Sequence, residues 1–170
     1  MRNIELKARL RDRSHALAVC ARIGAEPKGD IHQVDTYFPV ANGRMKLREC
    51  DSGEDYLVYY RRPDVADSKA SDYFIEPASS TLKETLAAAL GTMGVVDKVR
   101  TLWLWRNVRI HIDRVVGLGD YLEFEAVLSD EFGDQDGFAK LSFLRTEFEI
   151  AESDLETGSY LDLLSTYRDE

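Results

Sequence analysis

The sequence has few of the residues that cross-link small extracellular domains. It contains two cysteines, Cys20 and Cys50, among 170 residues. Neither belongs to a Cys-x-x-Cys or Cys/His pattern, which argues against a disulfide framework and a structural zinc site and fits a reducing compartment. We therefore expect a cytoplasmic protein that depends on a hydrophobic core.

Long hydrophobic runs are also missing. No stretch approaches the roughly 20 apolar residues that a bilayer-spanning helix requires, and the first eleven residues alternate in charge instead of forming an apolar signal core. We expect a soluble protein with no membrane partner. Hydrophobic residues make up 44% and aromatic residues 10%, which is typical of a globular protein, and the length predicts a single domain over residues 1–170.

Basic residues are in the minority. There are 22 Lys and Arg against 31 Asp and Glu, which gives a formal net charge of −9. Because contacts with a nucleic-acid backbone require a basic surface, this balance argues against general DNA or RNA binding. Local clusters of Lys and Arg could still bind a small anion.

Alternation of polar and apolar residues predicts a largely antiparallel β-structure, and Asn42-Gly43 is a strong hairpin signal. Strand patterns cover residues 3–11, 30–40, 44–49, 56–62, 72–76, 95–105, 108–116 and 121–127. Helical spacing and capping residues predict helices over 13–23, 81–90, 138–150 and 153–164. We expect residues 160–164 of the last helix to seal or line one end of a barrel.

Charged side chains are sorted onto one face of five of the predicted strands. Leu, Ile, Met, Val and Phe occupy the opposite faces. If the apolar faces pack under helices, the charged faces point inward, and about eight strands can close around them. The fold class that this predicts is α+β: a closed antiparallel eight-stranded β-barrel around a polar tunnel, with helices packed outside. The inward set is Glu5, Lys7, Arg9, Arg44, Lys46, Arg48, Lys98, Arg100, Arg109, His111, Asp113, Glu123 and Glu125.

Each strand taken alone could have only a solvated outer face. Repetition over five strands favours a charged interior instead, and buried cations then need water, carboxylates or an anion. Many cations beside a few carboxylates suit a triphosphate bound with a divalent metal. Glu123 and Glu125 point the same way on one strand and can share that metal, whereas we interpret His32 and His111 as hydrogen-bonding side chains.

Eight segments occur in an order that resembles a known family. They are NIELKAR at residue 3, QVDTYF at 33, KLR at 46, YRRP at 60, KVR at 98, RIHID at 109, GLGDYLEFE at 117 and GSYLDLL at 158. Together they resemble the CYTH domain proteins, or triphosphate tunnel metalloenzymes. That family includes class IV adenylyl cyclases, thiamine triphosphatases and inorganic tripolyphosphatases.

The resemblance implies a basic tunnel for the triphosphate and acidic ligands for Mg²⁺ or Mn²⁺. It implies triphosphate binding by Lys7, Arg9, Lys46, Arg48, Arg61, Lys98, Arg100 and Arg109. It implies metal ligation by Glu5, Glu123 and Glu125, and catalytic roles for Lys7, Arg109 and Asp113. Arg62 is the alternative to Arg61, since it points to the other face. Asn3 stands where the family motif has its first glutamate and brings no charge.

The predicted function is a metal-dependent, class IV adenylyl cyclase-like reaction that converts ATP to cyclic AMP and pyrophosphate. One alternative is a triphosphatase acting on thiamine triphosphate or inorganic tripolyphosphate. A second is a protein that binds triphosphate or polyphosphate without turnover. In each case the partner is a small-molecule triphosphate, and a homodimer is left open.

Overall fold

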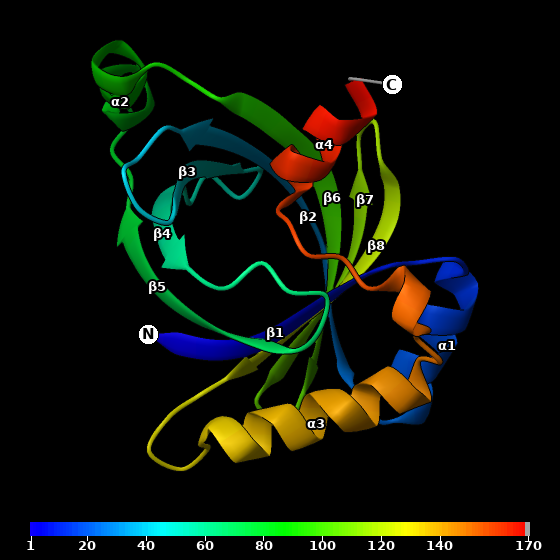
Figure 1. The fold of residues 1–170 in the computed structure, drawn as a ribbon. Helices are drawn as coiled ribbons and strands as arrows, with labels where there is room; N and C mark the ends of the chain where they lie inside the picture. The colour runs from blue at the N-terminus through cyan, green and yellow to red at the C-terminus, as the bar shows by residue number, and fades with distance from the viewer. Residues whose placement is uncertain (169–170) are drawn as a thin grey trace.

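The computed structural model describes residues 1–168, which form a closed β-barrel with helices outside it (Figure 1). All neighbouring strands are antiparallel, in the order β1-β5-β4-β3-β2-β6-β7-β8. The strands are β1 (Arg2–Arg9), β2 (Glu26–Phe38), β3 (Arg44–Cys50), β4 (Tyr56–Arg61), β5 (Lys69–Pro77), β6 (Gly94–Trp105), β7 (Val108–Val115) and β8 (Gly119–Val127). The predicted fold class is confirmed.

Within residues 1–168, four α-helices and one short 3₁₀ helix connect or follow the strands. They are α1 (Arg13–Arg22), α2 (Leu82–Leu90), α3 (Asp134–Glu147), η1 (Glu152–Asp154) and α4 (Tyr160–Arg168). Helix α3 begins before the predicted residue 138 because Asp134 and Asp136 lie in its first turn, where acidic side chains stabilise a helix. None of the helices within residues 1–168 is long and apolar enough to cross a membrane.

The predicted helix over 153–164 is wrong in its first half. Only η1 and, from Tyr160, α4 are helical, and the chain between them is extended. There Leu155 forms an isolated β-bridge with Ala8, and the Glu156 backbone N–H donates to the Lys7 carbonyl at 3.0 Å. Pairing with β1 therefore replaces the helical hydrogen bonds at this point.

Strand β1 closes the barrel between two distant strands. In β1, Glu5 lies opposite Lys69 of β5, and Lys7 lies opposite Glu123 of β8. Strand β5 is longer than the predicted 72–76, since its first residues pair with β1 and its later ones with β4. Glu5 consequently lies between Lys69 of β5 and Glu125 of β8, two strands that are distant from β1 in sequence.

The hydrophobic core lies between the barrel and helices α1 and α3, which run along one side of it (Figure 1). In β1, buried Ile4 and Leu6 point into this core, while Glu5 and Lys7, in alternate positions, line the interior cavity of the barrel. Burying a side chain of leucine size stabilises a fold by about 1.5–3 kcal/mol. The apolar faces thus pack outward under helices and leave the barrel interior to charged groups, as the alternation predicts.

Candidate functional site: a charged tunnel

The barrel encloses a cavity of about 200 Å³ lined mostly by polar and charged side chains. The structure brings together in it six cations that the sequence places on inward faces: Lys7, Lys46, Arg48, Lys98, Arg100 and Arg109. Glu5, Glu123 and Glu125 line the same cavity. The cavity therefore combines an excess of cations with a smaller group of carboxylates.

Asp35 of β2 holds two of these cations. Its Oδ1 accepts from Arg48 Nε at 2.6 Å, and its Oδ2 accepts from Arg48 Nη2 at 2.7 Å and from Lys46 Nζ at 2.8 Å. The Asp35 side chain is 1% exposed. Burial opposes its ionisation, but the charges of Arg48 and Lys46 hold the pKa of the carboxyl well below its usual range. Sequence analysis assigned no role to Asp35, whose partners depend on the register between β2 and β3.

Asp113 of β7 has an equivalent set of partners. Its Oδ1 accepts from Arg100 Nε at 2.8 Å, and its Oδ2 accepts from Arg100 Nη2 at 2.7 Å, Lys98 Nζ at 3.2 Å and the Tyr160 hydroxyl at 2.9 Å. The side chain is 0% exposed, and Asp113 is not among the described residues that line the cavity. These partners enclose the carboxylate, and the predicted catalytic role of Asp113 stays a prediction.

Lys98 has a charge that depends on pH near neutrality. Burial, followed by repulsion from Arg100, lowers the pKa of Lys98 to about 7, although Asp113 opposes the shift. Burial also lowers the pKa of Lys7. An anion entering the tunnel would stabilise the protonated form of both lysines.

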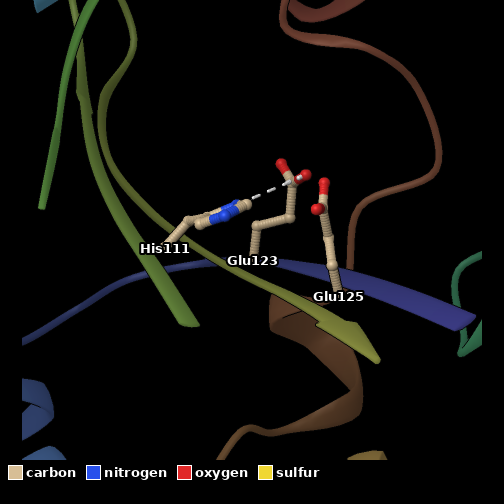
Figure 2. Close-up of side chains that lie close together, drawn as sticks. All are labelled: His111, Glu123 and Glu125. Atoms are coloured by element: carbon tan, nitrogen blue, oxygen red, sulfur yellow. Dashed lines mark ion pairs between the residues drawn. The ribbon is translucent and has the colours of Figure 1, made fainter. Parts of the chain in front are cut away.

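His111, Glu123 and Glu125 form the acidic cluster of the tunnel (Figure 2). One potential ligand atom from each lies within 4.8 Å of the others. His111 on β7 is directly opposite Glu123 on β8, and Glu125 lies two residues further along that strand. The strand register therefore creates a three-residue group, of which the sequence predicted only the two glutamates as metal ligands.

The donor set of this cluster fits a divalent cation. His111 Nδ1 is buried and has no hydrogen-bond partner among residues 1–168, its nearest Glu123 oxygen being 3.9 Å away. Burial, followed by the charge of Arg100, lowers the pKa of His111, which favours the neutral imidazole that binds metals. Two carboxylates and an imidazole are ligands that Mn²⁺ accepts, and carboxylates suit Mg²⁺.

Glu5 lies outside this three-residue group. Its Oε1 is 2.8 Å from Nε of Arg62. Burial raises the pKa of Glu5 to about 7, and Glu123 and Glu125 add to the shift while Arg62 opposes it. The predicted metal role of Glu5 therefore remains a prediction, with Arg62 as the partner that the structure shows.

Arg62, and not Arg61, is the inward residue at the end of β4. The Arg62 side chain is 3% exposed and lines the cavity, whereas Arg61 is exposed and not part of that lining. Val58 and Tyr60 also line the cavity, so the two-residue period of a strand directs Arg62 inward. Arg62 therefore takes the tunnel position predicted for Arg61, which lines only the adjoining cavity, and a binding role for Arg61 stays a prediction.

Arg9 and Asn3 lie at opposite ends of the inward face of β1. The Arg9 side chain is 46% exposed, and its Nε is 3.9 Å from Glu156 Oε1. Arg9 does not line the cavity, so the expected contact with the triphosphate is not supported by its position. Asn3 does line it, and its buried Oδ1 has no hydrogen-bond partner within the described part of the chain.

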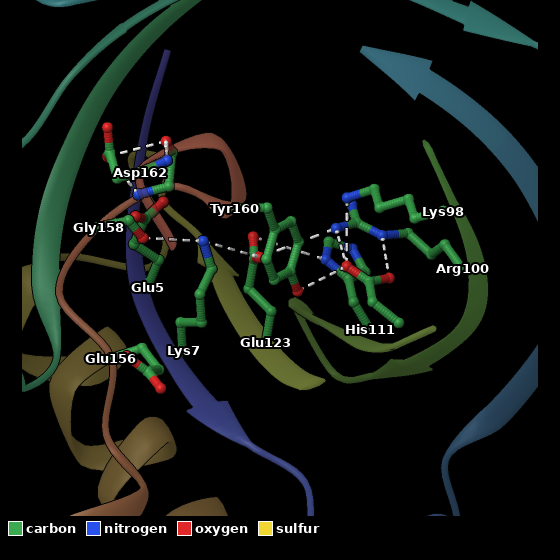
Figure 3. A network of polar contacts seen from close by, with 12 residues as sticks. Glu5, Lys7, Lys98, Arg100, His111, Glu123, Glu156, Gly158, Tyr160 and Asp162 are labelled. Atoms are coloured by element: carbon green, nitrogen blue, oxygen red, sulfur yellow. Dashed lines mark hydrogen bonds and ion pairs between the residues drawn. The ribbon is translucent and has the colours of Figure 1, made fainter. Parts of the chain in front are cut away.

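The segment before α4 reaches into the tunnel (Figure 3). Lys7 Nζ donates to the Gly158 carbonyl at 3.2 Å, and Arg62 Nη1 donates to the Thr157 carbonyl at 2.9 Å. The ring of Tyr160 lies between two lysines, with Lys7 Nζ at 4.2 Å and Lys98 Nζ at 4.9 Å from its centroid. Tyr160 therefore lines the tunnel, as expected for the start of the predicted 160–164 segment.

The closed barrel and its charged interior define a tunnel protein, and comparison with known families gives the same result. The chain belongs to the CYTH domain family, whose sequence profile matches residues 1–160. Members of this family are adenylyl cyclase-like or triphosphatase enzymes. No curated protein sequence is significantly similar to this chain.

Solved structures share the fold at low sequence identity. The PH1012 protein from Pyrococcus horikoshii superposes with a TM-score of 0.82 at 23% identity, over 95% of this chain and 99% of its own. A candidate adenylate cyclase from Vibrio parahaemolyticus gives 0.76 at 20% identity, over 96% and 97%. A candidate adenylyl cyclase from Hippeastrum, described as having dominant triphosphatase activity, gives 0.64 at 14% identity, over 97% and 96%. These similarities show the fold.

Proposed function

We propose that the protein is a metal-dependent enzyme that acts on the phosphate chain of a triphosphate bound in the barrel. The observation that carries this proposal is the convergence of six cations on a cavity that also contains His111, Glu123 and Glu125. Phosphate oxygens bind such cations through short charge-assisted hydrogen bonds. Reactions of phosphate chains depend mainly on positioning and on stabilisation of negative charge, which fixed cations provide.

The residues have separate tasks in this proposal. Lys46, Arg48, Lys98, Arg100 and Arg109 bind and orient the phosphates. His111, Glu123 and Glu125 would hold Mg²⁺ or Mn²⁺, which when bound would neutralise phosphate oxygens and make the phosphorus more electrophilic. Lys7 Nζ lies 3.9 Å from Glu123 Oε2. Lys7 therefore places a positive charge between the phosphate-binding cations and the metal-binding cluster.

The size of the cavity restricts what enters the barrel. At about 200 Å³ it is smaller than the ~300–1,000 Å³ typical of pockets for drug-sized ligands. A second cavity of about 580 Å³ adjoins it and shares Tyr37, Arg62 and Ser159 with it. The tunnel therefore suits the phosphate chain alone, while an organic group attached to that chain would remain outside the barrel.

Two reactions are compatible with this arrangement. In the adenylyl cyclase-like reaction, the 3′-oxygen of ATP attacks the α-phosphorus and pyrophosphate leaves, and the adjoining cavity supplies room for a nucleoside. In the triphosphatase reaction, water attacks the terminal phosphorus, the diphosphate leaves and orthophosphate forms, for which the tunnel suffices. The similarity in fold to candidate cyclases and to a protein with triphosphatase activity supports testing both.

A product assay tests the proposal. The purified chain would be incubated with ATP, thiamine triphosphate or tripolyphosphate and with Mg²⁺ or Mn²⁺, and cyclic AMP, pyrophosphate and orthophosphate would be quantified. Glu123→Gln is the inactive control, and Asp97→Asn, a charge change on an exposed ion pair with His32, is the matched surface control. Calorimetric binding without any product would indicate a binding protein. Neither binding nor product with all three compounds would contradict the proposal.

A further inference from the structure

The tunnel contains the same arrangement of three side chains twice. We call this arrangement a Lys-Arg/Asp unit. The first unit consists of Lys46, Arg48 and Asp35, and the second unit consists of Lys98, Arg100 and Asp113. In both units arginine Nε donates to Oδ1, arginine Nη2 donates to Oδ2, and lysine Nζ donates to Oδ2. The repeated element is therefore a specific hydrogen-bond pattern and not merely a similar charge.

Strand register produces both units in the same way. Asp35 is directly opposite Arg48 in the β2–β3 pair, and Asp113 is directly opposite Arg100 in the β7–β6 pair. Because β2 pairs directly with β6, the strand order β3-β2-β6-β7 places the two units side by side. In each unit the lysine and arginine line the cavity while the aspartate does not. The carboxylates thus support the cations from behind.

Burying these charges is costly, which points to a purpose beyond stability. Buried ion pairs often stabilise a protein no better than hydrophobic residues of similar volume. A bidentate carboxylate does, however, fix the plane of a guanidinium group. When its lysine is protonated, each unit has a net charge of +1, since two cations then share one anion, so it still attracts phosphate. Each aspartate thus orients a lysine and an arginine in the tunnel, and it cancels part of their positive charge.

We propose that Asp35 and Asp113 are matched positioning residues, each fixing one Lys–Arg pair so that neighbouring phosphates of one chain bind to two equivalent sets of donors. The proposal rests on the proposed action on a triphosphate. Neither aspartate touches the substrate; each acts through its lysine and arginine. The two units differ in one contact, because the Tyr160 hydroxyl also donates to Asp113, which ties the second unit to α4.

Steady-state kinetics of Asp35→Asn test the proposal with tripolyphosphate and Mn²⁺. We expect kcat to fall about 10- to 100-fold, because small misplacements of binding groups have effects of this size. KM should stay unchanged or decrease, since the variant tunnel carries one negative charge less. Asp35→Glu should recover part of the lost rate because it restores the carboxylate. Asp113→Asn should likewise lower kcat and leave KM unchanged or lower.

Two further variants keep the test decisive. Asp97→Asn, which makes the same chemical change on the outside of the barrel, should match the wild type. Arg48→Lys keeps the charge but lacks the bidentate fork, so it should lower kcat more than calorimetric affinity for tripolyphosphate, even if Asp35→Asn does not fold. An Asp35→Asn enzyme with wild-type kinetics, or one with a larger effect on KM than on kcat, would overturn the inference.

The two proposals fail differently. If the wild type neither binds nor converts any triphosphate, the proposed function is wrong and the positioning role falls with it. If the wild type is active but Arg48→Lys and Asp35→Asn both retain its kcat, only the positioning role is wrong.

Discussion

Arg62 Nε lies 2.8 Å from Glu5 Oε1 inside the tunnel. Glu5 of β1 is thus paired with Arg62, which directly follows β4, while Glu123 and Glu125 group with His111. In the proposed function, the cluster would hold the divalent cation and the cations around it would bind phosphate. Each part can be tested separately.

Glu123→Gln and Glu125→Gln should each weaken metal binding. Loss of one carboxylate charge from three ligands should lower Mn²⁺ affinity at least about tenfold, which corresponds to ~1.4 kcal/mol. Calorimetric titration of Mn²⁺ into each variant measures this change. Glu152→Gln, on the exposed 3₁₀ helix, is the matched control, and wild-type affinity in both tunnel variants would remove these residues from the metal site.

Asn3→Glu should strengthen metal binding. Asn3 lines the tunnel on the same face of β1 as Glu5, and its buried Oδ1 has no hydrogen-bond partner among the described residues. An additional carboxylate at this position increases the attraction for a hard cation. Titration of Mn²⁺ or Mg²⁺ into the wild type and the variant compares the two affinities. Equal or weaker binding by the glutamate variant would show that this position does not contribute to the site.

Arg62→Met should lower the affinity for tripolyphosphate about tenfold or more, whereas Arg61→Met should have little effect. The reason is that Arg62 lines the tunnel and Arg61 is exposed, although the two are adjacent in sequence. A charge-assisted hydrogen bond of this kind is worth ~1.5–3 kcal/mol. Calorimetry on both variants decides, and equal losses would mean that the inward direction of Arg62 is irrelevant to binding.

Tripolyphosphate binding in the absence of metal should weaken as the pH rises from 6 to 8. Burial and Arg100 lower the pKa of Lys98 to about 7, so this lysine is cationic below that pH and neutral above it. In Lys98→Arg the new arginine stays cationic throughout this range, so the affinity should decline less steeply with pH. Burial raises the pKa of Glu5 to about 7, and its ionisation should cause the decline that remains. Titrations at several pH values measure both slopes, and parallel slopes would contradict the role of Lys98.

Gly137→Ala should destabilise the fold by about 1–3 kcal/mol, the usual cost of overpacking. Helix α3 approaches β1 so closely here that an added Cβ would lie 2.7 Å from Ile4 Cγ1. Gly133→Ala is the matched control, because a Cβ at that position meets nothing within 4 Å. Urea denaturation of the two variants measures the difference between their free energies of unfolding. No difference would show that α3 shifts to accommodate the added methyl group without cost.

Much of the barrel could be predicted from the sequence because charged and apolar residues alternate with the period of a strand. Lys46 and Arg48, or Lys98 and Arg100, are two residues apart and therefore had to share a face. Arg61 and Arg62 could not be separated in this way. They are adjacent at the end of a strand, so their directions depend on where the pairing of β4 stops.

Contacts between distant segments could not be predicted. The roles of Asp35 and Asp113 depend on which residues lie opposite them, and alternation along one strand contains no information about register. The hydroxyl of Tyr160 reaches Asp113 across 47 positions. His111 is a single histidine on a strand, and only its position opposite Glu123 makes it part of the acidic cluster.

The placement of β1 has a consequence for folding. Its partners β5 and β8 are joined to it through pairs such as Glu5 with Lys69 and Lys7 with Glu123, so closing the barrel requires contacts over long stretches of chain. Such nonlocal pairings slow folding. Until they form, Lys7 and Glu5 are not beside Glu123, and the cations have no enclosed space in which to meet a phosphate. In the proposed function, triphosphate binding should therefore require that β1 is paired with both β5 and β8.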